Sequence, residues 1–363
     1  MSVAALSPGL QRISQELREA VYLTTNLDIT QPRTIGAVLT ERCNYRCLSC
    51  ACWRNEAAAD ELTLEQWIAA FEDVRAFVGP FAVQFGGGEP FVFKPFLELV
   101  EWCRASRIGW MMTTNGSAFS PRNALRIAGA HPLAVNISVD GATDAVHDRS
   151  RGVAGSLKAI TRGIAALRQA REQCGASFPI RIKATVHREN FREMPALVRW
   201  AVLVGASSVD FSPVRHWTPE VASSLWLRPS DEQDLEGVIE ALVAMKRSGA
   251  PVETEEARIR SWPAHFRGER IAPSLGPCRV GLRDYCILPN GDVRSCWFYP
   301  VLGNVKASSA KEIWQSAATQ SLRAEMTNCP SFGDAKCALS CLSHRTLGED
   351  ARRFIMLARR SVA

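Results

Sequence analysis

Short apolar runs alternate with longer amphipathic stretches along most of the chain. Six of the short runs look like buried strands, and the stretches between them repeat apolar residues with the period of a helix. In residues 191–204, for example, Met194, Leu197, Val198 and Ala201 share one helical face. The predicted strands are residues 34–40, 82–85, 110–114, 134–139, 180–186 and 208–213, and the predicted helices between them are 63–77, 93–106, 121–129, 155–173 and 191–204.

This order of elements predicts the fold class. Strands that alternate with helices imply parallel βαβ units and an α/β architecture. Six units are too few for a closed eight-fold barrel, so we expect a partial (β/α)6 TIM-like barrel. In such a barrel the active site lies at the C-terminal ends of the strands, and the residues that directly follow each strand are therefore candidates for chemistry.

The rest of the chain departs from this alternation. A long helix is predicted over 230–248, a β-hairpin around Pro289-Asn290-Gly291-Asp292, and a further helix over 309–325. The expected division is a helical N-terminal extension (1–32), the barrel (33–215), a helical linker (216–271), a small cysteine-rich module of hairpin and helix (272–345) and a C-terminal helix (346–363).

Composition narrows the class of protein. The chain has 363 residues, 47% hydrophobic and 22% charged, which is typical of a globular protein. Its 43 Lys and Arg against 37 Asp and Glu give a net charge of +6, but they are scattered and form no nucleic-acid arm. No apolar run reaches the ~20 residues of a membrane helix, and the start lacks the layout of a secretory signal. We therefore expect a cytoplasmic protein that binds neither nucleic acid nor membrane.

Twelve cysteines are the strongest compositional signal. Four lie between residues 43 and 52 and six between 278 and 341, whereas Cys103 and Cys174 stand alone within helical patterns. In a reducing compartment, clustered thiols favour metal binding over disulfides. We interpret the two isolated cysteines as buried structural thiols.

Cys43, Cys47 and Cys50 follow the first predicted strand in a C-x3-C-x2-C pattern. Three thiolates on one loop can hold three irons of a cubane [4Fe–4S] cluster, which leaves the fourth iron without a protein ligand. Cys52 can supply a fourth thiolate instead, and this would favour an electron-transfer cluster or zinc.

This loop resembles the hallmark of the radical S-adenosylmethionine (SAM) enzymes. In that family a glycine-rich turn after the second strand binds the amino group of SAM, and here Gly86-Gly87-Gly88-Glu89 stands at that place. Glycines let a backbone approach a ligand closely, and a carboxylate such as Glu89 can accept from an ammonium group.

The resemblance also implies further SAM contacts. Ser138 would contact the ribose or methionine part of SAM, and Arg149 or Arg151 its carboxylate. Ser49 departs from the family, which usually has a bulky residue near the adenine at that position. The implied chemistry is a one-electron cleavage of SAM to a 5′-deoxyadenosyl radical, which abstracts hydrogen from a substrate. A flavodoxin- or ferredoxin-type protein would donate the electron.

The C-terminal cysteines resemble the SPASM and twitch extensions of that superfamily, which hold auxiliary [4Fe–4S] clusters. Six thiols cannot supply two clusters with four cysteines each, so we favour one auxiliary cluster. Two clusters completed by Asp334, or a zinc-stapled module, are the alternatives. The expected ligands are Cys278 and Cys296 with two of Cys329, Cys337 and Cys341, while Cys286 is either a further ligand or a packed strand thiol.

The sequence therefore predicts an oxidoreductase-type radical SAM enzyme. The low number of cysteines favours a small-molecule natural product or cofactor precursor as substrate; maturation of a ribosomally synthesised peptide is the alternative. A non-enzymatic iron–sulfur electron carrier is a third hypothesis. Side chains that could handle a proton at the substrate are His187 and His216, which follow the last two predicted strands, together with Cys52, Tyr285 and Cys286.

Overall fold

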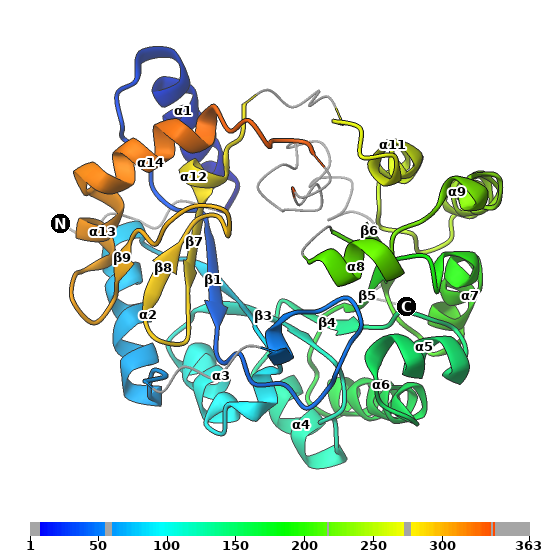
Figure 1. Cartoon of the computed structure of the whole chain (residues 1–363). Coiled ribbons are helices and arrows are strands. Elements are labelled where there is room, and N and C mark those ends of the chain that lie inside the picture. The colour runs from blue at the N-terminus through cyan, green and yellow to red at the C-terminus, as the bar shows by residue number, and fades with distance from the viewer. Residues whose placement is uncertain (1–7, 55–59, 216–217, 272–276, 335–336, 338–363) are drawn as a thin grey trace.

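The computed structural model describes residues 8–54, 60–215, 218–271, 277–334 and 337. Its strands form one nine-stranded sheet in the order β6-β5-β4-β3-β2-β1-β7-β8-β9, which curves into an open ring (Figure 1). The strands are β1 (Thr34–Val38), β2 (Ala82–Gly86), β3 (Gly109–Thr114), β4 (Ala134–Ser138), β5 (Ile180–Val186), β6 (Ser208–Pro213), β7 (Asp284–Ile287), β8 (Asp292–Arg294) and β9 (Gly303–Asn304). The six strands predicted for a partial barrel are confirmed and run parallel to their neighbours.

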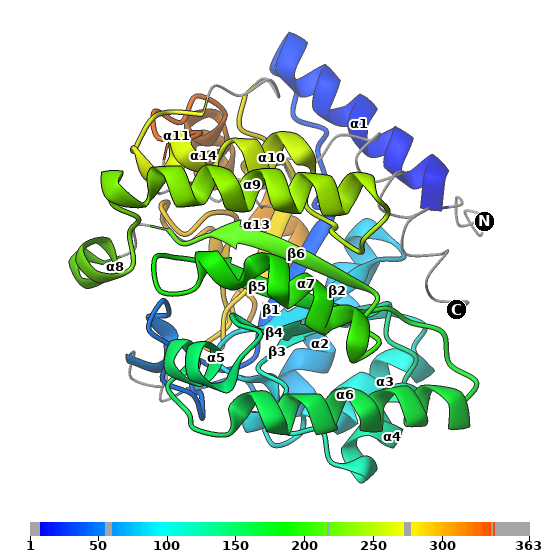
Figure 2. The ribbon, with the colours of Figure 1, turned by 90° about the vertical axis from the view of Figure 1, so that its right-hand side faces the viewer.

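Helices cover the outer face of this sheet (Figures 1 and 2). Those of the barrel are α2 (Leu64–Val78), α3 (Phe96–Ala105), α4 (Pro121–Gly129), α5 (Asp144–Arg151), α6 (Ser156–Gln173) and α7 (Met194–Leu203). In β1, β2 and β3 every second residue is buried, including Ile35, Val83 and Trp110 in the hydrophobic core. Since side chains alternate across a strand, the remaining positions face the inside of the ring.

The inner face is polar, and its residues form rows across the sheet. Thr113, Asn136 and Arg181 occupy successive strands at matched register. Matched positions in a parallel sheet point to the same side, so this row lines the inner wall across β3, β4 and β5. The strands therefore position polar side chains around a central space.

The cysteine-rich module is part of the same sheet, which differs from the separate module expected from residue 272. β7 pairs parallel with β1, and the predicted hairpin follows as antiparallel β7 and β8. The helix expected over 309–325 is two helices, α13 (Ala310–Gln315) and α14 (Ala317–Thr327). The chain is extended at Ser316, whose side chain accepts from the Thr319 N–H and begins the second helix.

The flanking segments are helical where the structure describes them. The N-terminal extension is α1 (Pro8–Thr25), and its Glu19 pairs with Arg283 of α12 (Val280–Arg283) at 2.7 Å. The linker holds α8 (Pro219–Ser224), α9 (Glu232–Arg247), α10 (Glu256–Arg260) and α11 (Trp262–Phe266). The C-terminal helix expected over 346–363 lies outside the described residues. Within the described part of the chain, no helix is long and apolar enough to cross a membrane.

Candidate active site

Cys43, Cys47 and Cys50 lie on the loop after β1, which we call the cluster loop (residues 39–54). Hydrogen-bond donors from other elements approach two of the sulfurs. The Asn115 side-chain amide lies 4.0 Å from Cys43 Sγ, and Arg151 Nη1 lies 3.8 Å from Cys47 Sγ. Such contacts stabilise negative charge on sulfur and are among the features that tune an iron–sulfur cluster.

The third sulfur is stabilised by its own loop. A hydrogen bond from the Cys52 thiol, helped by the backbone N–H groups of Cys52 and Trp53, lowers the pKa of Cys50 below the ordinary value of a thiol. The Cys52 thiol is thus a donor to Cys50. Burial raises the pKa of Cys47 to about 11, so a thiolate there needs a cation beside it.

This donor set fits the iron–sulfur cluster that the sequence predicts. Three sulfurs with N–H or S–H donors are suited to hold three irons, and iron would supply the positive charge that a buried thiolate needs. Among the described residues, no three His, Cys, Asp or Glu side chains converge on a single metal ion. A cubane sets a different requirement, because each of its cysteines binds a different iron.

The glycine turn after β2 packs directly on the cluster loop. The Gly88 N–H donates to the Thr40 carbonyl at 2.8 Å. A Cβ atom on Gly88 would lie 2.1 Å from the Arg42 carbonyl oxygen, and one on Gly87, whose φ is +118°, would lie 2.5 Å from that of Thr40. These two glycines therefore allow the loops to meet, whereas Gly86 faces open space and lines the cavity described below.

Glu89 links the loops that follow β2 and β3. Its buried carboxylate accepts from the Thr114 hydroxyl and the Asn115 N–H, both at 2.8 Å, and from the Phe91 N–H at 3.3 Å. Burial raises the pKa of Glu89 to about 7, although these hydrogen bonds oppose the shift. The contact between Glu89 and the ammonium group of SAM stays a prediction. The contacts in the structure show that Glu89 holds Asn115 beside Cys43.

We expect the Glu89 carboxyl to make stability depend on pH. The folded pKa of about 7 exceeds the ordinary 4.5, so the folded state binds the proton more tightly than the unfolded chain. The stability contribution is complete below pH 4.5 and is lost as pH rises through 7. Because one pKa unit corresponds to about 1.4 kcal/mol, the parent should lose a few kcal/mol relative to Glu89→Gln across this range. Urea unfolding of the reconstituted proteins without SAM measures it, and parallel pH profiles would contradict the prediction.

A second buried group supports the cluster loop from the other side. Asp140 is fully buried after β4, and its Oδ2 lies 2.8 Å from Arg151 Nε and 2.9 Å from Ser150 Oγ. Burial alone would raise the pKa of Asp140, but the charges of Arg151 and His187 lower it overall. Asp140 therefore stays ionised and holds Arg151 beside Cys47.

The structure separates the two arginines predicted for the SAM carboxylate. The Arg149 side chain is 70% exposed and pairs with Glu189 at 3.0 Å, directed toward solvent. Arg151 is inside, between Asp140 and Cys47. Ser138 ends β4 and is half-buried on the inner face, in register with Lys183.

The rings of two proposed proton-handling residues are occupied by contacts within the protein. His187 is fully buried, with Nε2 3.0 Å from Ser150 Oγ, and burial lowers its pKa. The sequence predicted that His187 faces the barrel mouth. In the structure its ring instead supports Ser150 and, through it, Asp140. Tyr285 is turned to the outer face, where its ring packs on Trp314. His216 lies outside the described residues.

Four cysteines of the second group come together. Cys278 packs with Val280 and Phe332, and Cys296, Cys329 and Cys337 pack against this cluster. Burial raises the pKa of Cys278 to about 12, and the charges of the other three thiols add to the shift. Four neighbouring buried thiols suit an auxiliary [4Fe–4S] cluster. Cys341 lies outside the described residues.

Cys286 is apart from these four. It lies on β7 opposite Gly36, where an added Cβ would meet its sulfur at 3.1 Å. Burial raises its pKa to about 12, and the charge that adds to this shift is Asp284, not another thiol. Of the two interpretations left open by the sequence, the position favours a strand thiol over a fifth ligand.

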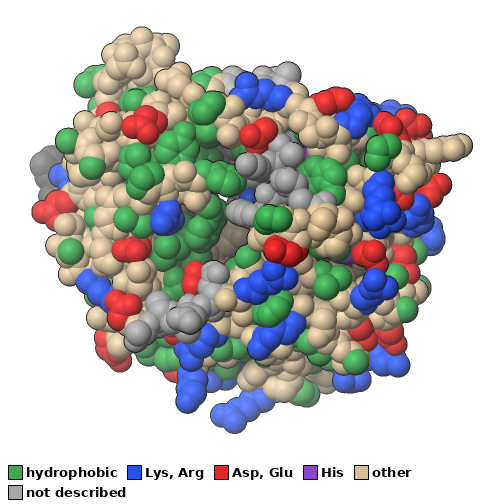
Figure 3. Space-filling model, viewed as in Figure 1, with side chains coloured by type: hydrophobic (Ala, Val, Ile, Leu, Met, Phe, Trp, Pro, Cys, Tyr) green, Lys and Arg blue, Asp and Glu red, His purple; other side chains and the backbone are tan. Residues whose placement is uncertain are grey.

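One cavity of about 410 Å³ is lined both by the last residues of β1 and β2 and by the second group of cysteines. Val38 and Gly86 line one end, the four auxiliary cysteines line the other, and Gln84 and Cys286 lie between. Figure 3 shows a central hollow on this face with apolar side chains along its wall. Trp297 and Phe298 line the cavity and are 52% and 49% exposed.

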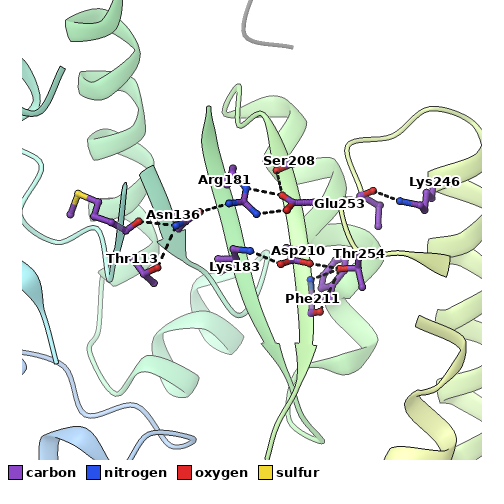
Figure 4. A network of polar contacts seen from close by, with 12 residues as sticks. Thr113, Asn136, Arg181, Lys183, Ser208, Asp210, Phe211, Lys246, Glu253 and Thr254 are labelled. Carbon is purple, nitrogen blue, oxygen red and sulfur yellow. Dashed lines mark hydrogen bonds and ion pairs between the residues drawn. The ribbon is translucent and has the colours of Figure 1, made fainter. Parts of the chain in front are cut away.

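A polar network occupies the inner wall across β4, β5 and β6 (Figure 4). Arg181 is satisfied by Glu253, 2.7 Å from Nε, and by Asn136, 2.9 Å from Nη1. Lys183 pairs with Asp210, whose other oxygen accepts from Thr254 at 2.8 Å. Burial and the charge of Arg181 lower the pKa of Lys183 to about 8, although Asp210 opposes the shift.

Lys183 and Asp210 were missed by the sequence reasoning. Their signal is the alternation Arg181, Lys183, Thr185 within a strand whose other positions are apolar, which places charges on the inner face of a barrel. An ammonium that titrates near neutral pH beside Ser138 is suited to donate or accept a proton.

Comparison with known proteins matches both halves of the chain to family profiles. The Radical SAM superfamily profile matches residues 37–201, and the SPASM iron–sulfur cluster-binding domain matches residues 278–341. The chain is 30% identical to mycofactocin maturase MftC of Mycolicibacterium smegmatis, over 76% of this chain and 68% of that protein. It is 24% identical to an AdoMet-dependent heme synthase of Methanosarcina barkeri, over 79% and 83% of the two chains.

Solved structures share the fold. SuiB of Streptococcus suis bound to SAM superimposes with a TM-score of 0.65 at 15% identity, covering 88% of this chain and 75% of SuiB. SuiB bound to its precursor peptide SuiA gives a TM-score of 0.63 at 14% identity, over 89% and 73%. The partial barrel with its C-terminal extension is thus a known arrangement.

Proposed function

Because the chain belongs to the radical SAM superfamily and carries a SPASM domain, we propose that it abstracts hydrogen from a substrate held between its two cysteine regions. The observation that carries the proposal is the single cavity lined by Gly86 and Val38 at one end and by the four auxiliary cysteines at the other. A substrate in this cavity would contact the auxiliary cysteines and the ends of β1 and β2, whose following loops carry Cys43, Cys47, Cys50 and the glycine turn.

The candidate residues have different roles in this proposal. Cys43, Cys47 and Cys50 hold the SAM-binding cluster, and Cys278, Cys296, Cys329 and Cys337 hold an auxiliary one. When bound, the first cluster and SAM supply a 5′-deoxyadenosyl radical by one-electron cleavage of the sulfonium. Asn115 and Arg151 orient the cluster loop through Glu89 and Asp140.

Lys183 is the proton-handling residue of this proposal. It lies on the inner wall beside Ser138, and Asp210 fixes its position. Among the described residues, no other hydrogen-bonded partner of its ammonium is recorded, so two of its three N–H groups stay available. It can therefore give a proton to the substrate or take one from it.

A small molecule is the substrate class that the cavity supports best. A volume of about 410 Å³, part of it beside the auxiliary cysteines, suits a compact ligand. The heme synthase relative acts, by its name, in the synthesis of a small molecule. The second candidate is a peptide, which the exposed Trp297 and Phe298 and the peptide-bound SuiB favour.

The test uses deuterium to trace the hydrogen. The source organism is grown in deuterated medium, and its small-molecule and peptide fractions are incubated separately with reconstituted enzyme, dithionite and SAM. We expect 5′-deoxyadenosine to carry deuterium with the small-molecule fraction. Deuterium from the peptide fraction alone would select the second candidate, and no 5′-deoxyadenosine in any reaction would overturn the proposed function.

A further inference from the structure

An aromatic ring with two guanidinium groups stacked over it lies on the surface of the cluster loop. Arg46 and Arg54 both stack over the Trp53 ring, with their Cζ atoms 5.4 and 5.0 Å from its centroid. Both arginines are exposed and the tryptophan is half-buried. We call Arg46, Trp53 and Arg54 the stacked surface.

The stacked surface is bonded to the backbone of two cluster cysteines. The Trp53 indole N–H donates to the Cys47 carbonyl at 3.0 Å, and Arg46 donates to the Cys43 carbonyl at 2.8 Å. A protein that contacts Arg46 and Trp53 therefore contacts side chains that are hydrogen-bonded directly to the backbone of two predicted cluster ligands. The proposed function requires an electron at that place for each SAM cleaved.

The chemistry of the stacked surface fits an acidic protein partner. Tryptophan and arginine are the residues that contribute most to protein–protein binding. The acidic partner of Arg54 is Glu220, at 3.9 Å and 68% exposed, a weak contact that water can replace. The recorded hydrogen bonds of Arg46 go to carbonyl groups. In Figure 3, Lys and Arg side chains gather below the central hollow.

We propose that Arg46, Trp53 and Arg54 form the docking surface for a small acidic electron carrier of the flavodoxin type. The inference rests on the proposed function, which needs such a reductant. One electron passes from the reduced carrier to the SAM-binding cluster, and no bond is made or broken at the surface. The carrier is held by charge and by the tryptophan face, and the Cys43 and Cys47 carbonyls connect this face to the cluster ligands.

The experiment compares two reductants on the reconstituted full chain. Stopped-flow absorbance follows reduction of the cluster by a reduced bacterial flavodoxin or by dithionite. For Arg54→Glu we expect the flavodoxin rate to fall about tenfold and its dependence on salt to weaken. The dithionite rate and the iron content should stay those of the parent. Arg54→Lys, which keeps the charge, should retain most of the flavodoxin rate.

Arg267→Glu is the matched control, because this side chain is 48% exposed, like the 42% of Arg54, and has the same charge change elsewhere on the surface. It should leave both rates unchanged. An unchanged flavodoxin rate in Arg54→Glu, or an equal loss with Arg267→Glu, overturns the docking surface. An equal loss with dithionite overturns it too, since the defect would then lie in the cluster. Failure of the parent to cleave SAM with dithionite would instead overturn the proposed function.

Discussion

Replacing Cys43, Cys47 and Cys50 together by alanine should remove half of the iron and all SAM cleavage. The parent holds two cubanes in our interpretation, about eight irons per chain, and the variant should keep about four. The four auxiliary thiols lie before α12 (Cys278), after β8 (Cys296) and after α14 (Cys329 and Cys337), and the apolar cluster in which they pack includes no residue of the cluster loop. Iron and sulfide are measured after anaerobic reconstitution, and 5′-deoxyadenosine after addition of dithionite and SAM.

Two control variants define what this result means. Cys174→Ala should keep about eight irons, because this thiol donates to the Leu125 carbonyl, away from both groups. Cys278→Ala with Cys296→Ala should lose the other four irons and keep SAM cleavage. If the triple variant retained about eight irons, two auxiliary clusters would exist and a non-cysteine ligand would be needed. If it retained none, the C-terminal thiols would hold no cluster.

The barrel was predictable from sequence because its signal is local. Each strand is a short apolar run, and each helix places apolar residues on one face, as in 191–204. The continuation of the sheet into β7 was not predictable in this way. Asp284–Ile287 pairs with a strand about 250 residues earlier, and no local pattern states which edge of a sheet a distant strand will join.

In the candidate site, too, the local features were predictable from sequence and the contacts between distant residues were not. The cysteine spacing and the glycine turn were visible, since both are compact motifs. The contacts that support them were not, because each joins loops from different strands. Glu89 reaches Asn115 over 26 residues, and Asp140 reaches Thr185 over 45.

These supporting contacts explain where the structure places individual candidate residues. His187 follows a strand, as an active-site residue would, but its ring is used to hold Ser150 and thereby Asp140. Arg149 and Arg151 are two residues apart on a short helix, which turns one to solvent and the other to Cys47. The role of each residue depended on which side of α5 it occupies, and the helix bounds were not part of the sequence prediction.

The buried pair of Arg181 and Glu253 gives the largest expected effect on stability. Both side chains are 2% exposed, and Arg181 donates to Glu253 at 2.7 Å through Nε. Glu253→Gln leaves the guanidinium charge buried without its counter-charge. Removing one partner of a buried ion pair costs ~3–5 kcal/mol, because the other charge keeps its desolvation penalty. Urea unfolding monitored by circular dichroism should show this loss.

Glu256→Gln is the control, because this carboxylate is 31% exposed and its partners Arg247 and Arg260 are on the surface. It should cost far less than Glu253→Gln, since water replaces a lost surface partner. A double variant, Arg181→Met with Glu253→Leu, removes both charges and should recover part of the loss. The recovery stays incomplete because Asn136 and Ser208 then lose their hydrogen-bond partners. Equal losses in Glu253→Gln and Glu256→Gln would show that the inner-wall network is not held by its buried charges.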